Sequence, residues 1–395
     1  MFASYWFLIF SVIFFSSYWF CPIPYLRKFT ILIASMTFHF HFAGPAGVLP
    51  IIFLGINTYF AGLSRNKKIQ TFSILLCVGI LIFYKYTVFI FSQIVSYFSI
   101  AWSQAALQQI QSTLLPAAPP LAISFFIFEF IHYLADLQKG KTPIQSPIDF
   151  ILFSIFWPSV VSGPIKRFDD FLVNLSIGYK KINLVDIQLG LMRITMGLIK
   201  KLFIADNLTG YIDFWYPKFT YLTIEQRWCF VAAVSMRILF DFSGYSDIAI
   251  GFARLMGITL PENFSWPYIA RNLQTFWRRW HISLSSWIRD YIYIPLGGNQ
   301  HGTFRKIFNG ICAFSLCGLW HGASGHFIVW GLYHGLGLVI TTSLPKRIQI
   351  THPVLTIITY PFSWLITFVF VSIGWLYFFY PVSDANTMII LLLKN

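Results

Sequence analysis

Long apolar runs, separated by short polar or basic segments, recur along the whole chain of 395 residues. Many of these runs approach about 20 residues, the length that an α-helix needs to cross the hydrocarbon core of a bilayer. They lack the strict alternation of a membrane β-barrel, and a backbone in lipid must satisfy its own hydrogen bonds. The pattern therefore predicts an all-α polytopic membrane protein with roughly ten or eleven membrane helices.

Several of the apolar runs contain breaks that predict bent or interrupted helices. AGPAG at 43–47 separates two short runs and predicts a tight helical hairpin, and the run at 71–102 is too long for one simple span. The uncharged stretch 103–120 predicts a loop outside the cytoplasm. The predicted spans are 5–24, 29–42, 48–63, 71–102, 121–135, 148–164 with an internal break, 186–204, 228–256 interrupted by the polar run DFSGYSD, 308–342 as two spans divided at 322–325, and 353–380.

Composition and charge support the membrane class and argue against nucleic-acid binding. Charged residues make up 11% of the chain, whereas a soluble domain carries about a quarter. The net charge of +14 comes partly from short basic loops such as the one with Arg65, Lys67 and Lys68. Positive residues favour the cytoplasmic side, so these loops are predicted to lie there. The first apolar run lacks a basic n-region and a cleavage site, which predicts a retained helix.

Neither the cysteines nor the histidines show the spacing of a metal site. The five cysteines lie in apolar surroundings without paired spacing, which is typical of small buried side chains. No carboxylate or cysteine falls at a ligand spacing from the histidines, so no metal is expected. A nucleophile elbow, a phosphate-cradling glycine loop and a dinucleotide fingerprint are also absent from the sequence, so neither a covalent acyl-serine mechanism nor a bound cofactor is expected.

The segment 276–334 carries the strongest candidate for chemistry, because it places imidazoles in tryptophan-rich membrane sequence. His321 lies in the middle of an apolar run, preceded by Trp320 and followed by Gly322 and Ala323. An imidazole near neutral pKa is the usual general base for activating a hydroxyl, and ionisable residues inside a membrane are functional candidates. The alternative is a packed histidine that hydrogen-bonds between helices. We favour the general base.

A second histidine, His281, follows Arg278, Arg279 and Trp280 in a polar, interfacial segment. Spacing alone leaves open whether His281 contacts lipid headgroups or belongs to an active site. Arg278 and Arg279, with Arg271 and Arg289, form a basic patch with two interpretations, which also stay open. They snorkel to anionic lipid, or they dock a phosphate-bearing acyl donor or an acidic carrier protein, because arginine forks suit phosphate oxygens.

The polar run at 241–247 places Asp241, Tyr245 and Asp247 inside an otherwise apolar helix. Carboxylates are costly in lipid unless they are paired, so we predict a structural pairing with an arginine such as Arg237 or Arg254. The alternative is that the run lines a polar cavity. Under that interpretation the three residues contact substrate.

Three further polar residues lie within predicted spans. Glu129 and His132 are three apart and share a helix face, which favours a helix–helix hydrogen bond over a proton relay. Lys85 lies in the middle of a long span, where insertion costs about 3 kcal/mol, so it is expected to face protein or snorkel. His326 and His334 are weaker candidates for the site.

The run DFSGYSDIAIGFARLMGITLPENFSWPYIARNLQTFWRRWHISLSSWIRDYIYIPLGG at 241–298, followed by GLWHGA, resembles the membrane-bound O-acyltransferase family. Within that family it is most similar to the bacterial alginate O-acetyltransferase branch, the membrane subunit of polysaccharide acetylation systems. PLAISFFIFEFIHYLAD at 120–136 and VSGPIKRF at 161–168 resemble the same branch. The resemblance extends over about residues 25–340.

The resemblance implies a helical fold around a central tunnel, with His321 matching the family's invariant histidine and His281 its second active-site position. It implies transfer of an acetyl or other small acyl group from a cytoplasmic thioester, acetyl-CoA or an acyl carrier. The acceptor would be a hydroxyl of an envelope polysaccharide or an exported partner protein. Arg278 and Arg279 would then steer the donor's phosphate, and Trp280 and Trp320 would wall a dry tunnel.

The expected protein is one membrane domain over 1–395, with a catalytic core at about 121–340, in the bacterial inner membrane. The chain departs from the branch in ending soon after Tyr380, where members usually continue through further helices. Two alternatives stay open: D-alanyl transfer to teichoic-acid acceptors, and a non-catalytic transporter or flippase of an acyl or lipid-linked carrier. The sequence lacks the paired, symmetric interrupted helices that are typical of transporters.

Overall fold

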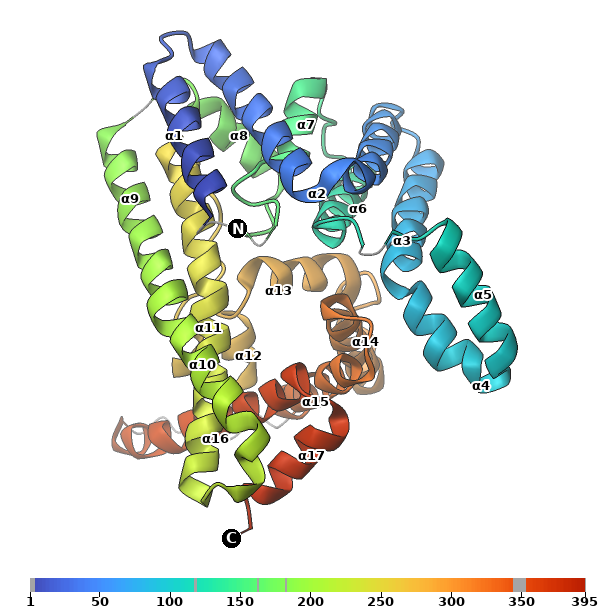
Figure 1. The fold of residues 1–395 in the computed structure, drawn as a ribbon, viewed down its shortest axis with the longest axis vertical. Coiled ribbons are helices and arrows are strands. Elements are labelled where there is room, and N and C mark those ends of the chain that lie inside the picture. Colours follow the sequence, from blue (N-terminus) through green and yellow to red (C-terminus); the bar gives the residue numbers. More distant parts are fainter. Residues whose placement is uncertain (1–3, 117–118, 162, 182, 344–352, 395) are drawn as a thin grey trace. The chain divides into compact units, whose positions relative to one another are not determined.

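The computed structural model describes residues 4–116, 119–161, 163–181, 183–343 and 353–394. These residues form helices and connecting turns, with no β-strand among them, so the predicted all-α class is confirmed (Figure 1). Contacts divide the chain into two compact units. The first unit is Met1–Thr195 with Ser246–Pro261, and the second is Met196–Tyr245 with Glu262–Asn395. The single domain expected from the sequence stays a prediction.

The first unit is built from helices of very unequal length. They are α1 (Tyr5–Phe20), α2 (Pro24–Leu63), α3 (Lys67–Phe89), α4 (Ser96–Phe98), α5 (Ile100–Thr113), α6 (Ile123–Gln138), α7 (Pro147–Ile155), α8 (Phe168–Gly178) and most of α9 (Leu184–Leu198), together with the last turns of α11 (Ile224–Leu255).

The second unit contains most of α11 and the helices that follow it. They are α10 (Asp206–Trp215), α12 (Leu273–Trp277), α13 (Ile282–Ile288), α14 (Gly302–His321), α15 (Gly325–Ser343), α16 (Pro353–Phe379) and α17 (Val382–Leu391). The short α12 and α13 lie in the stretch that lacks long apolar runs. A π-helical turn, Ile199–Ala205, links α9 to α10.

Most of the predicted breaks occur, but three predictions need correction. α2 continues across 43–47 as two helical parts joined by a kink at Gly44, whose φ is 65°, and it changes direction in Figure 1. The stretch 103–120, predicted as a loop, begins as the helix α5. Ser99 caps α5 by accepting from the Trp102 amide, and the following Ala and Gln residues are good helix formers. The lack of charge at 103–120 was therefore not a reliable sign of a loop.

The interruptions after Ile155 and after His321 are confirmed. Between α7 and α8 the described residues form turns, and α14 ends directly before Gly322. The run 228–256, in contrast, is not interrupted, because α11 continues through Asp241 and Asp247. Both carboxylates have basic partners, which removes the need to break the helix there.

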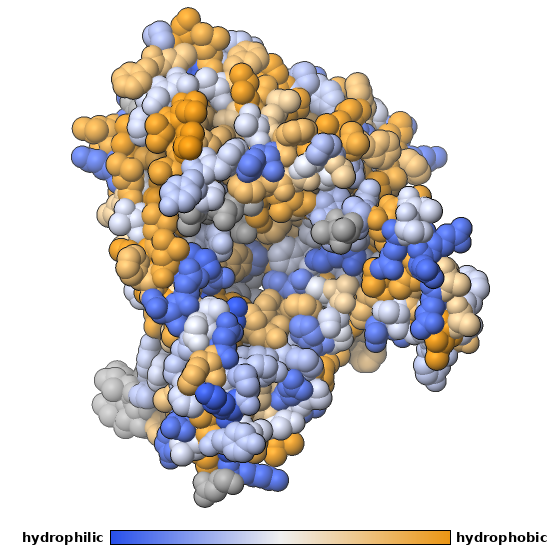
Figure 2. Space-filling view, in the orientation of Figure 1, coloured by the Kyte–Doolittle hydropathy of each residue, from blue (hydrophilic) through white to orange (hydrophobic). Residues whose placement is uncertain are grey.

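Apolar side chains cover the outer faces of α1 and α2, toward the top of the view in Figure 2. Leu8, Val12 and Ile33 are each about 60% exposed, a pattern that suits contact with lipid tails rather than water. Within the described residues, three helices are long and apolar enough to cross a membrane. They are Pro24–Leu63, Lys67–Phe98 and Thr359–Phe379.

Aromatic rings fill the cores of both units. In the first unit Trp157 is fully buried and packs edge-on against Phe10 and Phe14 of α1. In the second unit Trp375 of α16 packs on Trp280 with ring centroids 4.8 Å apart. α14 and α15 approach very closely, since a Cβ at Gly318 would lie 2.1 Å from the Phe327 carbonyl oxygen.

Candidate active site

His281 sits at a strained backbone position between α12 and α13. Its φ and ψ are 42° and 56°, the left-handed region that non-glycine residues rarely adopt. Asn263 hydrogen-bonds the two residues that follow His281, Ile282 and Ser283. Its carbonyl accepts from the Ile282 amide at 2.9 Å, and its side-chain oxygen accepts from the Ser283 hydroxyl at 2.6 Å and the Ser283 amide at 3.3 Å. These bonds fix the direction of the His281 side chain.

The imidazole of His281 is buried among aromatic rings of the second unit. Only 2% of the residue is exposed, and Phe242 stands edge-on to the ring at 4.6 Å. His281 lies on none of the helices long enough to cross a membrane. Burial, and then the nearby His321, lower its pKa well below the usual value, so the ring is neutral. Its Nε2 has no hydrogen-bond partner within the described part of the chain.

His321 ends α14 and lies close to His281. The Trp320 ring contacts both histidines, with its centroid 6.1 Å from that of His281 and 4.7 Å from that of His321. Trp330 and Phe378 border His321 at 5.2 and 4.8 Å. The structure thus brings the two histidines singled out in the sequence into one aromatic-walled place.

Gly322 follows His321 at the end of α14, and its lack of a side chain matters for packing rather than for the backbone. A Cβ at Gly322 would lie 2.2 Å from the Phe327 ring, which packs beside His321. A larger residue would push this ring away and alter the wall behind the imidazole. The small residues after His321 therefore allow close packing there.

Arg278 and Arg279 follow α12 and lie directly before Trp280. Arg278 is exposed and Arg279 half-buried, and no carboxylate lies within ion-pair distance of either among the residues described. Arg289, in contrast, pairs with Asp290 at 2.7 Å. Arg278 and Arg279 are thus the members of the predicted basic patch available for an anion, whereas Trp280 is buried in the core.

The polar run of α11 pairs with α9 and the π-helical turn rather than with the arginines we predicted. In the first unit, Asp247 accepts from Arg193 at 2.6 Å. In the second, Asp241 lies 2.7 Å from Lys201, whose ammonium also lies 5.5 Å from the centroid of the Tyr245 ring. The predicted pairing is right in kind and wrong in partner, because the sequence could not show which helix lies beside α11.

The two arginines proposed as partners have other contacts. Arg254 pairs with Asp186 at 3.0 Å, and the guanidinium of Arg237 lies 4.8 Å from the centroid of the Phe379 ring. Arg254 therefore ties the last turn of α11 to the start of α9. Arg237 contacts the end of α16.

The remaining polar candidates have structural contacts. Glu129 pairs with Lys166 at 2.6 Å in the core of the first unit, a partner that the sequence did not suggest. The ring of His132 contacts the Phe128 carbonyl of its own helix at 3.2 Å. Lys85 faces protein as expected, with its ammonium 3.5 Å from the Ser124 hydroxyl.

The two weaker histidine candidates lie on α15. His326 contacts the Tyr377 carbonyl at 3.0 Å, and His334 is fully buried between Trp277 and Trp330. His334 and His321 contact the same Trp330 ring from different turns.

Sequence reasoning missed Asn263, Phe242 and Phe378, which position or border the histidines. Asn263 had one usable signal, a polar residue in LPENFSW directly before the basic aromatic segment. Phe242 and Phe378 carried none, because a phenylalanine in an apolar helix is ordinary. Within the described ranges, no three His, Cys, Asp or Glu side chains gather closely enough to hold a metal ion.

The arrangement suits proton transfer beside a reactive carbonyl. A neutral imidazole can accept a proton from a hydroxyl, and a second imidazole can hydrogen-bond the oxygen that gains charge. Aromatic rings contact both histidines, and His281 is buried whereas His321 is half-buried. Two unpaired arginines nearby in the chain can attract an anionic reactant.

Comparison with known proteins agrees with this chemistry. The model of the MBOAT, membrane-bound O-acyltransferase family matches residues 69–383. The probable alginate O-acetylase AlgI of Pseudomonas putida is 40% identical over 265 residues, which cover 66% of this chain and 52% of the relative. The peptidoglycan O-acetyltransferase of Helicobacter pylori is 36% identical over 327 residues, covering 76% and 60%.

A teichoic acid D-alanyltransferase of Bacillus subtilis is also similar, at 32% identity over 225 residues that cover 55% of this chain and 57% of the relative. The chain spans about half the length of the alginate relatives that it matches. The family match covers far more than half of the chain and includes both histidines. This protein therefore belongs to the membrane-bound O-acyltransferase family.

Proposed function

We propose that this protein transfers an acetyl or other small acyl group from a thioester donor to a hydroxyl of a cell-envelope polysaccharide or exported partner. The observation that carries the proposal is the pair of imidazoles, His281 and His321, which both contact the Trp320 ring. The relatives named for O-acetyl transfer are more similar to the chain than the one named for D-alanyl transfer. Acetyl is accordingly the first acyl group to test.

In the proposed reaction, His321 accepts the proton of the acceptor hydroxyl while the hydroxyl oxygen attacks the thioester carbonyl. A new carbon–oxygen bond forms, the carbon–sulfur bond breaks, and the protonated imidazole returns its proton to the departing thiolate. His281 donates a hydrogen bond through its unused Nε2 to the carbonyl oxygen, which gains negative charge in the transition state. Proton transfer by a positioned side chain such as His321 accelerates a reaction by about 10²–10⁴-fold.

Other residues bind and shield the reactants in this proposal. Arg278 and Arg279 attract the phosphate of acetyl-CoA or of an acyl carrier, since neither arginine has an acidic partner in the described structure. Trp280 and Trp320 keep the thioester away from water. Polar contacts set the position of α11. Lys201 contacts Asp241 and Tyr245, and Arg193 pairs with Asp247. Asp241 and Tyr245 are half-buried, so they are the members of this run open to substrate.

The proposed location is the bacterial inner membrane, crossed several times, with the donor on the cytoplasmic side. The basic loops predict that side for the donor, and the acyl group would leave toward the envelope. Membrane lipids surround the apolar outer faces, and nucleic acid has no role. Neither a metal nor a bound cofactor takes part in the proposal.

The decisive experiment measures free thiol released from acetyl-CoA by purified protein, with and without envelope polysaccharide. The first variant is His321→Gln, which replaces the imidazole by a polar side chain of similar size. The matched control is His326→Gln, a histidine on the adjacent helix α15. We expect thiol release by the wild type and the control, and a loss of at least about 10²-fold in His321→Gln. Full activity of His321→Gln would refute the mechanism. Thiol release from a D-alanyl carrier thioester but not from acetyl-CoA would show that the donor carries D-alanyl instead of acetyl.

A further inference from the structure

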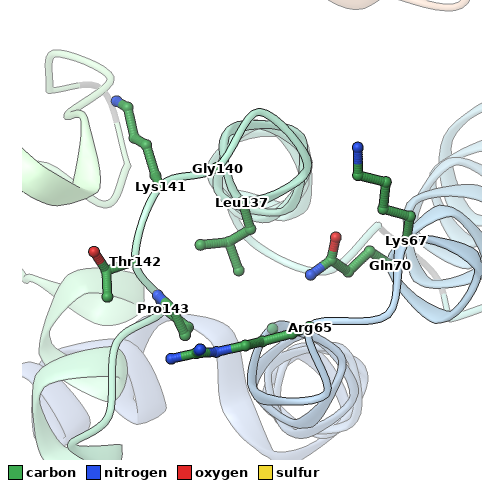
Figure 3. A pocket seen from close by; sticks show the side chains of 9 residues that line it. Arg65, Lys67, Gln70, Leu137, Gly140, Lys141, Thr142 and Pro143 are labelled. Atoms are coloured by element: carbon green, nitrogen blue, oxygen red, sulfur yellow. The ribbon is translucent and has the colours of Figure 1, made fainter.

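A pocket of about 240 Å³ lies in the first unit where the turn between α2 and α3 meets the loop after α6 (Figure 3). Residues from both connections line it: Gly62, Arg65, Lys67, Gln70, Leu137, Gly140, Lys141, Thr142 and Pro143. None of them belongs to the histidine site or to its neighbours. The pocket thus has no role in the acyl transfer proposed above.

The walls of the pocket are fixed by side-chain bonds across the two connections. The Gln138 amide, at the end of α6, donates to the Lys67 carbonyl at 3.3 Å and to the Thr71 hydroxyl at 2.9 Å. Asn66 caps α3 by accepting from the Lys68 amide at 2.9 Å. The first turn of α3 lies beside the pocket, because Lys67 and Gln70 line it, and the positive end of the helix dipole faces that side.

The charges in the pocket are unequally compensated. Lys141 lies 2.9 Å from Asp136 and 2.7 Å from Asp169, so its charge is already balanced. Arg65 and Lys67 have no carboxylate within ion-pair distance in the described part of the molecule. Two uncompensated cations on one pocket make its lining net positive.

A buried amide presents a hydrogen-bond donor to the pocket. Gln70 is 2% exposed, and its side chain lines the pocket. Figure 3 shows the amide nitrogen of Gln70 turned toward the space beside Leu137, with the guanidinium group of Arg65 along the next side. This nitrogen can donate to an anion, whereas the Gln70 Oε1 is an acceptor and has no part in binding one.

We propose that this pocket binds a phosphate group whose negative charge is not neutralised by a cation of its own. Arg65 supplies a planar fork for two phosphate oxygens, Lys67 a second positive charge, and the Gln70 amide a hydrogen bond from below. A phosphatidylglycerol headgroup and a free phosphate ion both have this chemistry. Phosphatidylcholine has the same phosphate, but its choline cation would be repelled by the two basic side chains.

The location of the pocket agrees with a lipid source. Arg65 and Lys67 belong to the basic loop that the sequence predicts to be cytoplasmic, where anionic lipids attract such residues. The adjoining helices α2 and α3 are among those long and apolar enough to cross a membrane. A headgroup seated here would leave its acyl chains beside the exposed apolar side chains of these helices.

Native mass spectrometry of the purified full chain tests the proposal with three probes: short-chain phosphatidylglycerol, short-chain phosphatidylcholine and inorganic phosphate. Arg65→Gln and Lys67→Gln each remove one charge from the pocket, and Gln70→Leu removes the amide. Lys68→Gln is the matched control, because Lys68 loses the same charge one residue along α3 without lining the pocket. Arg65 and Lys67 are exposed, so these variants should fold.

We expect the wild type to bind phosphatidylglycerol more tightly than phosphatidylcholine. Arg65→Gln and Lys67→Gln should each bind phosphatidylglycerol about tenfold less tightly than the wild type, whereas Lys68→Gln should bind it as the wild type does. Competition by inorganic phosphate at similar concentration would support the site with a free ion as its ligand. Equal losses in all three charge variants would reduce the effect to general attraction and overturn the proposal. Equal binding of the two lipids, with no binding of inorganic phosphate, would overturn it as well.

Discussion

Replacing Asn263 with alanine tests whether the backbone strain at His281 is held in place for catalysis. The Asn263 side-chain oxygen accepts from both the hydroxyl and the amide of Ser283, at 2.6 and 3.3 Å, and both residues are buried. Each buried donor left without a partner costs about 1–3 kcal/mol, so the variant loses about 2 kcal/mol or more. A left-handed non-glycine residue costs about 1–3 kcal/mol, so His281 should relax once that support is removed.

The assay is thiol release from acetyl-CoA, read as kcat and KM separately, beside thermal unfolding in detergent. Misplacing a catalytic group by about 1 Å can cost 10²-fold, so kcat should fall by about that factor while KM changes little. Asn309→Ala is the matched control: Asn309 is also fully buried and donates to the Gly298 carbonyl at 3.0 Å. Similar losses of stability and of kcat in both variants would refute the argument, because they would make the effect of Asn263 one of general folding.

Three further predictions concern stability and donor binding. Glu129→Gln leaves the buried Lys166 without its carboxylate and should cost about 3–5 kcal/mol, whereas replacing both by methionine should cost much less; equal melting temperatures for the two variants would contradict this. Gly318→Ala should lower the melting temperature, because its Cβ would lie 2.1 Å from a carbonyl oxygen of α15, and an unchanged temperature would mean the helices separate easily. Replacing Arg278 and Arg279 together by glutamine should raise KM for acetyl-CoA about tenfold with little change in kcat, and an unchanged KM in low salt would exclude donor steering.

Apolar periodicity predicted the helices well because it depends only on local composition. The runs that became α1, α6, α15 and α16 were long and apolar, and the glycines after His321 marked a true break. The failures at α5 and α11 have different causes. α5 forms because Ser99 caps it and its Ala and Gln residues favour a helix, signals that the sequence contained but that the lack of charge outweighed in the prediction. α11 stays unbroken because Lys201 and Arg193 compensate its carboxylates, and a local pattern does not contain those partners.

The same limit applies to the candidate site. His281 and His321 could be predicted because imidazoles in tryptophan-rich membrane sequence are unusual, and the structure places the two near one ring. The partners of Asp241 and Asp247 could not be predicted, because Lys201 and Arg193 come from a different helix at no fixed spacing. Asn263 was hidden for a further reason. Its role depends on a backbone conformation at His281 that no side-chain pattern encodes.

The contact between α14 and α15 limits how reactants can reach His321. At Gly318 and Gly331 the two backbones touch, since a Cβ at either glycine would lie within 2.4 Å of a carbonyl oxygen on the other helix. Such a pair has no room to slide, so we expect the short break after His321 to stay fixed rather than to act as a hinge. We therefore expect any opening that admits a donor or an acceptor to come from other elements of the second unit. Their motion would then set the rate at which new reactants reach His321.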